Sequence, residues 1–216
     1  AITIGNYDGV HHGHQIIIKN LIKKAKKLGV KSVLLTFDPH PVKILAKHVA
    51  PKLIHTKEQK IECLSKLGLD AVVIQSFNTA FARHTAEEFF SKHLVKALNA
   101  RFISVGHDFT FGDKRSGTIE TLEILAYPQK IEIEVIEAQM IQNTLVSSSL
   151  IRKMIHQGNM KVANDLLTRD FYIDGTVIQG HQRGTALGIH TANLESPNEL
   201  IPEDGVYATR ISINGK

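Results

Sequence analysis

The sequence predicts an α/β fold with a Rossmann-like, doubly wound parallel sheet. Short apolar segments rich in β-branched residues alternate with segments of helical periodicity through residues 1–167. Strands that alternate with helices form parallel sheets, because each helix carries the chain back to the edge where the previous strand began. Downstream of Thr168 the helical periodicity disappears and strand-like segments with glycine turns take over. We therefore expect two domains, residues 1–167 and 168–216.

The individual elements follow from local patterns. Apolar runs predict strands at 1–4, 31–37, 71–77, 101–106 and 130–137. Helical periodicity or a capping sequence predicts helices at 15–28, 57–67, 86–97 and 159–167. Gly29 and Gly68 stand where glycine commonly ends a helix.

Composition narrows the class of protein and its partners. The chain has 216 residues, 43% of them hydrophobic and 22% charged, which is ordinary for a globular protein, and no apolar run is long enough to span a membrane. A single cysteine, Cys63, excludes an intramolecular disulfide and a multi-cysteine zinc site, so we expect a cytoplasmic protein. The net charge of +5 suits anionic partners. Because the lysines are dispersed along helix faces, we expect nucleotides as partners, with no nucleic acid and no membrane; an oligomeric state is not indicated.

The stretch from Gly5 to His14 places three glycines and three histidines between a strand and a helix. Ligands of open α/β sheets bind at this position, because free backbone N–H groups and the positive end of the helix dipole point out of it. Glycines let the backbone approach a phosphate, and imidazoles one turn apart can donate to the same group. We therefore predict a phosphate site around His11, Gly13 and His14. A metal site built from these histidines with Asp8 is the open alternative.

Two later stretches also suit phosphate. Residues 106–117 follow a strand and end in P-loop-like glycine spacing, but the Lys-Ser/Thr pair is missing, which argues against a Walker-type NTPase. This stretch is either a flexible basic turn or a loop that offers Lys114 and Arg115 to a polyphosphate. The serines at 147–149 are N-caps at minimum, and the same geometry points hydroxyl and N–H groups at an anion, with Arg152 one turn further on.

Read together, these stretches resemble one enzyme family. The matching motifs are GNYDGVHHGH at 5–14, TFDPHP at 36–41, and residues 106–117 and 146–152. Their order and spacing are similar to those of the prokaryotic bifunctional riboflavin kinase/FMN adenylyltransferases, also called FAD synthetases. Residues 175–193 and 205–208 resemble the opening of this family's kinase module. The resemblance implies the HxGH nucleotidyltransferase fold in residues 1–167, followed by the start of a β-barrel riboflavin kinase domain, truncated at residue 216.

The activity that the resemblance implies is FAD biosynthesis. The FMN phosphate attacks the α-phosphorus of ATP, giving FAD and pyrophosphate, and Mg²⁺ is bound mainly through the ATP phosphates. No protein nucleophile is needed, so the protein contributes positioning and charge stabilisation. The family's kinase module converts riboflavin and ATP to FMN. Because that barrel needs many more residues, including a downstream catalytic glutamate, this chain alone is not expected to be a competent kinase.

The resemblance also implies roles for individual residues. The catalytic candidates are His11, His14 and Arg152, with His14 the better placed for the charge that develops at the α-phosphate. The candidates for binding ATP and its phosphates are Asn6, Gly13, Ser147, Ser148 and Ser149. The candidates for flavin or nucleotide contacts are Asp38, Pro39, His40, Asp108 and Phe109. In the kinase fragment, Thr191 and Asn193 match positions that bind ATP and Mg²⁺.

The sequence departs from the family pattern at three of these motif positions. Tyr7, Ser149 and His190 stand where the family usually has Phe, Thr and Pro. The alternatives are another nucleotidyltransferase of the same fold, a flavin- or nucleotide-binding module that is inactive without further C-terminal residues, and a metal-dependent hydrolase built on the histidine cluster. The TFDPHP loop and the 175–193 segment argue against the first alternative.

Overall fold

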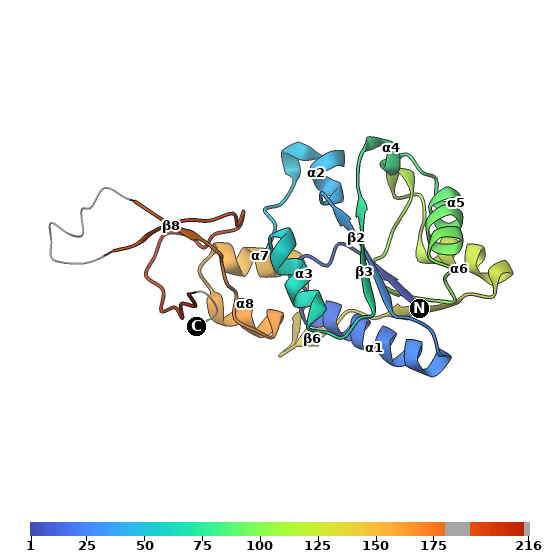
Figure 1. Cartoon of the computed structure of the whole chain (residues 1–216), viewed down its shortest axis with the longest axis horizontal. Helices are drawn as coiled ribbons and strands as arrows, with labels where there is room; N and C mark the ends of the chain where they lie inside the picture. The colour runs from blue at the N-terminus through green and yellow to red at the C-terminus, as the bar shows by residue number, and fades with distance from the viewer. Residues whose placement is uncertain (180–190, 214–216) are drawn as a thin grey trace.

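The computed structural model describes residues 1–179 and 191–213, and its centre is a five-stranded parallel sheet (Figure 1). The strand order is β3-β2-β1-β4-β5, so β1 lies in the middle and the winding direction reverses between β1 and β4. The strands are β1 (Ile2–Ile4), β2 (Val33–Asp38), β3 (Ala71–Ser76), β4 (Phe102–Gly106) and β5 (Glu132–Ile136). This order confirms the predicted Rossmann-like α/β class.

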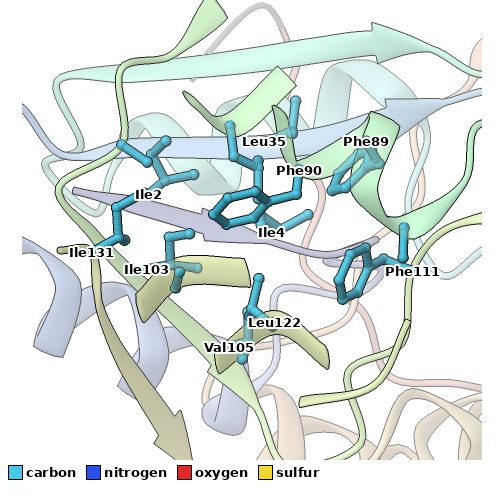
Figure 2. Close-up of a cluster of buried hydrophobic side chains, with 14 of the residues drawn as sticks. Ile2, Ile4, Leu35, Phe89, Phe90, Ile103, Val105, Phe111, Leu122 and Ile131 are labelled. Atoms are coloured by element: carbon cyan, nitrogen blue, oxygen red, sulfur yellow. The ribbon is translucent and has the colours of Figure 1, made fainter. Parts of the chain in front are cut away.

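Helices cover both faces of the sheet. One face packs against α1 (His12–Leu28) and α3 (Lys57–Ser65), through a buried cluster that includes Ile18, Leu34 and Leu64. The other face packs against α5 (Ala86–Phe89), a π-helix η2 (Phe90–Ala97) and α6 (Ile119–Ala126). Figure 2 shows this second core, in which strand side chains meet side chains of these three helices; its labelled residues include Ile2, Ile4, Leu35, Phe89, Phe90, Ile103 and Leu122.

A smaller third core lies beside the sheet, between α7 (Ser148–His156) and α8 (Met160–Leu167). Ile151 and Ile155 of α7 and Leu167 of α8 are fully buried there, and Ile54 from the loop before α3 joins them. The remaining short elements are α2 (Pro41–Leu45), η1 (Lys47–Val49), α4 (Thr79–Ala82), η3 (Asp113–Arg115), η4 (Tyr127–Gln129) and the hairpin β6 (Met140–Ile141)/β7 (Thr144–Leu145).

Two predicted helices differ from those observed. The first helix begins at His12 rather than at residue 15, because the His11 side chain is its N-cap and accepts from the backbone N–H of His14 at 3.4 Å. The helix predicted at 86–97 changes to π geometry from Phe90 onward, where Leu98 N–H bonds five residues back to the His93 carbonyl at 3.1 Å. The spacing of apolar residues marks neither a histidine N-cap nor a change from α to π geometry, so these two features were not predicted.

Downstream of α8 the described residues form strands and no helix, as the loss of helical periodicity in the sequence predicted. An antiparallel hairpin forms from β8 (Thr176–Ile178) and β9 (Asn193–Glu195), and it lies at the end of the molecule remote from α4, α5 and α6 (Figure 1). No helix occurs in the described residues after α8. The glycines predicted to form turns at 180, 184 and 188, and the departure at His190, lie outside the described residues. No helix in the described part of the chain is long and apolar enough to cross a membrane.

Candidate functional site

The turn after β1 lies at the carboxyl edge of the sheet, where the strand order reverses. Three of its residues have positive φ, namely Tyr7 at 51°, Gly9 at 85° and Val10 at 39°. The Tyr7 ring is buried and its hydroxyl bonds the Thr3 hydroxyl, and burial raises the pKa of that phenol. A tight turn anchored by a buried ring holds the chain in the conformation that leads directly into α1.

His11 and His14 form a stacked pair at the start of α1. Their ring centroids are 3.6 Å apart with an angle of 16° between the planes. Burial lowers the pKa of His11 to about 4, and burial followed by the neighbouring His11 lowers the pKa of His14 well below its ordinary value. Nδ1 of His14 is buried and has no hydrogen-bond partner among the described residues. Both rings are therefore neutral at pH 7, and an anion seated beside them would raise both pKa values.

Asp8 connects three separate segments of the chain. Its buried carboxylate accepts hydrogen bonds from the backbone N–H of Ile54 at 3.0 Å and of His55 at 3.3 Å. It also pairs with Nη2 of Arg152 at 2.7 Å. Its backbone carbonyl accepts from the Ser148 hydroxyl at 2.9 Å. Asp8 thus ties the β1 turn to the loop before α3 and to the start of α7.

This pairing changes what was expected of Arg152. The sequence suggested a guanidinium free to fork onto phosphate oxygens, whereas the structure has one of its nitrogens bonded to Asp8. Its Nε is buried without a partner among the described residues, and the side chain is 17% exposed. Arg152 therefore reaches the edge of the site with its orientation fixed by a carboxylate.

The three serines at the start of α7 have different environments. The Ser147 hydroxyl caps the helix by accepting from the backbone N–H of Leu150 at 3.2 Å, as predicted. The Ser148 hydroxyl donates to the turn after β1. Ser149 is exposed and makes no side-chain hydrogen bond with the described residues. The N-terminus of α7 is therefore fastened beside the β1 turn through Ser148.

Arg169 was not singled out from the sequence, yet it holds the β1 turn in place. Its guanidinium donates to the carbonyls of Gly9, Val10 and Leu167, the latter two at 3.1 and 3.0 Å. It also lies 2.9 Å from Nε2 of His55, and burial followed by this charge lowers the pKa of His55 to about 4. Because Arg169 is far from the turn in sequence and outside any motif, only the fold brings it there.

The loop after β2 closes a second side of the site. The Asp38–Pro39 peptide bond is cis, and Asp38 forms an ion pair with Lys57 at 3.0 Å. His40 caps α2, with its Nδ1 accepting from Val42 N–H at 3.2 Å, and burial lowers its pKa. A small cleft of about 30 Å³ opens here; its lining includes Asn6, Asp8, Asp38, His40, His55 and Lys60.

The remaining candidates lie further from the β1 turn or elsewhere. Asp108 is exposed in the loop after β4, and Phe109 in the same loop stacks on Phe111 with centroids 5.5 Å apart. Thr191 and Asn193 have exposed side chains in and beside β9, and they share no hydrogen bond with the turn after β1. The structure thus gathers His11, Asn6, His40, Ser148 and Arg152 around Asp8, with His14 stacked on His11, and does not bring Thr191 or Asn193 to them.

A metal site built on the histidine cluster finds no support in this geometry. Among the residues that the structure describes, no three His, Cys, Asp or Glu side chains converge to hold a metal ion. Asp8, the carboxylate expected to assist such a site, is engaged by Arg152 and by two backbone N–H groups.

Comparison with known proteins identifies the family. A family model described as FAD synthetase matches residues 1–150, and one described as riboflavin kinase matches residues 167–216. The chain belongs to the FAD synthetase family. The order of the two matches agrees with the order in which the site-bearing sheet and the hairpin occur.

Curated relatives share both parts. Three proteins named bifunctional riboflavin kinase/FMN adenylyltransferase are 37% identical (Buchnera aphidicola subsp. Schizaphis graminum), 35% identical (Listeria monocytogenes) and 32% identical (Escherichia coli K12). The alignments cover 98%, 100% and 98% of this chain and 68%, 69% and 67% of those proteins. This FAD synthetase family chain therefore spans about two thirds of the length of these relatives.

A solved structure shows the same fold. It is titled a macrolide-efflux protein from Streptococcus pneumoniae, and it superposes with a TM-score of 0.84 at 31% sequence identity. The superposition covers 96% of this chain and 68% of that one.

Proposed function

We propose that this FAD synthetase family protein transfers AMP from ATP to FMN, giving FAD and pyrophosphate. The observation that carries the proposal is the neutral, stacked His11–His14 pair at the N-terminus of α1, at the point where the strand order reverses. This position offers imidazole donors, free N–H groups and a helix dipole to one anion. Residues 1–167 form the transfer domain in this proposal, and residues 168–216 form the first part of a riboflavin kinase domain.

His11 and His14 bind the ATP phosphates in this proposal. Because both rings are neutral in the free protein, a bound triphosphate raises their pKa values and draws them toward the charged form. His14, whose Nδ1 is buried and unpartnered in the described structure, is the residue that meets the charge developing at the α-phosphate. Gly13 keeps the helix start free of a side chain beside that phosphate.

The start of α7 takes the leaving group. Ser147 and Ser148 bring hydroxyl groups and helix N–H groups beside the β1 turn, and Ser149 extends the same helix start. Arg152 adds a positive charge whose orientation Asp8 fixes. These groups match the needs of a pyrophosphate that departs with increased charge.

Asn6 and the Asp38–His40 loop bind the flavin or nucleotide on the other side of the β1 turn, with Asp108 and Phe109 contributing from the loop after β4. In this proposal Mg²⁺ is held mainly by the ATP phosphates. When bound, Mg²⁺ supplies charge neutralisation between phosphate oxygens. Thr191 and Asn193 bind ATP and Mg²⁺ only within a complete kinase domain. A cytoplasmic location stays a prediction from the single cysteine.

The test is to incubate the protein with FMN, ATP and Mg²⁺ and to follow FAD by chromatography. A His14→Ala variant is expected to lose at least about 100-fold in rate, the usual effect of removing a positioned charge-stabilising donor. His12→Ala, which removes the adjacent half-buried ring on the same turn, is the matched control and should stay within about threefold. If the unaltered protein binds ATP but makes no FAD, the transfer proposal is refuted and a binding module is favoured.

A further inference from the structure

Lys60 of α3 is a charged side chain at the carboxyl edge that the proposed mechanism leaves without a role. Its Nζ lies 3.4 Å from the Asn6 carbonyl, 3.3 Å from the Thr36 hydroxyl and 3.5 Å from the Phe37 carbonyl. These oxygens are all neutral, and the distances are long for hydrogen bonds to an ammonium group. The amine therefore sits at the ends of β1 and β2 with weak contacts and no paired carboxylate among the described residues.

The charges around this cleft leave Lys60 uncompensated. The Asp8 carboxylate pairs with Arg152 at 2.7 Å, and the Asp38 carboxylate pairs with Lys57 at 3.0 Å. Burial lowers the pKa of Lys60, although Asp8 and Asp38 act in the opposite direction, so the ammonium is poorly hydrated. A partly desolvated cation without a carboxylate partner gains free energy when an anion enters the cleft.

Arg169 makes the contrast clear, since it too contacts neutral oxygens. Its guanidinium bonds the carbonyls of Val10 and Leu167 at 3.1 and 3.0 Å and also reaches Gly9, so its donors are used to hold the chain. The Lys60 contacts at 3.3–3.5 Å leave the ammonium free to take a stronger acceptor. Arg169 is a structural cation, whereas Lys60 is placed to meet a ligand.

The position of Lys60 indicates which substrate it meets. A Cβ placed on Gly106 at the end of β4 would lie 3.8 Å from Ile17 of α1, and one placed on Gly13 would lie 3.4 Å from the His11 ring and 3.8 Å from Gln139, which follows β5. The first turns of α1 therefore lie beside the β4–β5 half of the edge. Lys60 lies over the ends of β1 and β2, beside the β2 loop, where its Nζ faces the Thr36 hydroxyl and the Phe37 carbonyl. The two phosphate-binding sets thus occupy opposite halves of one edge, with the β1 turn between them.

A transfer between two phosphate-bearing substrates needs one positive site for each of them. We infer that Lys60 binds the phosphate of the flavin mononucleotide acceptor and directs its attacking oxygen toward the α-phosphorus held by the His11–His14 side. This inference rests on the proposed adenylyl transfer. The attacking phosphate oxygen forms a P–O bond to the α-phosphorus as the bond to pyrophosphate breaks, and Lys60 remains protonated throughout. It acts as a positioning cation and takes no proton.

The experiment compares FMN with riboflavin, which is the same flavin without the phosphate. Lys60→Met keeps most of the side-chain length and removes its charge, and Lys60→Arg restores the charge. The matched control is Lys66→Met, at an exposed lysine that is the C-cap residue of the same helix and pairs with Glu62. Lys60→Met is expected to raise KM for FMN at least tenfold, to leave KM for ATP within twofold, and to leave riboflavin binding, measured by quenching of flavin fluorescence, unchanged. Lys60→Arg should recover part of the FMN affinity.

Three results would overturn the inference. A rise in KM for ATP without one for FMN would assign Lys60 to the nucleotide. Equal losses of FMN and riboflavin binding in Lys60→Met would show that Lys60 has a structural role. Unchanged kinetics of this variant would show that Lys60 does not contribute to the reaction. If Lys60→Met does not fold, the inference is tested with Lys60→Arg and the unaltered protein. The unaltered protein must then bind FMN at least tenfold more tightly than riboflavin, and Lys60→Arg must change the affinity for FMN and not that for riboflavin. If the unaltered protein makes no FAD yet prefers FMN through Lys60, the transfer proposal fails while the phosphate site stands.

Discussion

The ion pair between Asp8 and Arg152 should be among the strongest single contributions to the stability of this protein. The two side chains are 6% and 17% exposed, and the carboxylate also accepts from two backbone N–H groups. Removing one partner of a buried pair costs about 3–5 kcal/mol, because the other charge stays buried without compensation. We expect Asp8→Asn and Arg152→Met each to lower the free energy of unfolding by about 3 kcal/mol, at the low end of that range.

The double variant tests the reasoning. Because both charges disappear together, Asp8→Asn/Arg152→Met should lose about 2–3 kcal/mol less than the sum of the single losses, near the upper end of coupling energies for contacting residues. Free energies of unfolding would come from urea denaturation followed by circular dichroism. A coupling energy below about 0.5 kcal/mol, which is the value for independent sites, would refute the central place given to this pair.

Three further predictions concern pH, a glycine and the arginine clamp. Burial lowers the pKa of His11 and of His55 from 6.5 to about 4, so on acidification these histidines bind protons in the unfolded chain before they do so in the folded protein. The contribution of each histidine to the free energy of unfolding is therefore largest above pH 6.5 and falls toward pH 4 by up to about 1.4 kcal/mol per pH unit. Measuring Tm against pH checks this prediction. Gly9→Ala should lower the free energy of unfolding by at least about 2 kcal/mol, because its φ is +85° and a Cβ there would lie 2.8 Å from the Ile54 side chain. Gly68→Ala has nearly the same φ, +84°, but a Cβ there meets no atom, so it should cost about 1 kcal/mol. Equal losses of the two variants in urea denaturation would contradict this prediction. Arg169→Met should lower the rate of FAD formation at least about tenfold and weaken ATP binding measured by calorimetry, because the turn after β1 loses the hydrogen bonds that Arg169 donates to Val10 and Gly9. An unchanged rate and affinity would show that the turn keeps its conformation without Arg169.

Local patterns were enough to predict most of the fold. The alternation of β-branched runs with amphipathic segments predicted the parallel sheet, because strand and helix periods are written in neighbouring residues. The boundaries came out within about three residues, and the start of α1 was misplaced because its N-cap is a histidine. Helix α6, the short helices α2 and α4, and the π geometry after Phe90 were not predicted. The side chains of Thr118, His40 and Asn78 cap the starts of these three helices, whereas apolar periodicity does not mark the π geometry.

Some residues of the candidate site could be predicted from sequence motifs, and others could be found only from the fold. His11, His14 and Ser147 belong to short motifs whose strand-to-helix context is readable, and the structure places them at the expected helix starts. Arg169 and Lys60 belong to no such motif. Each acts on residues brought near it by the sheet order and by the packing of α3 and α8, and no local pattern encodes those distances.

The sequence by itself therefore determined the α/β class, and it predicted the carboxyl edge of the sheet as the site and a phosphate ligand at the turn after β1. These follow from residue periodicity, from glycine and from the types of donor. Only the tertiary structure decided that Asp8 is occupied by Arg152, that Arg169 holds the turn, and that Lys60 is left without a carboxylate partner in the described chain. Charge pairing depends on distance through space, and the fold alone fixes those distances.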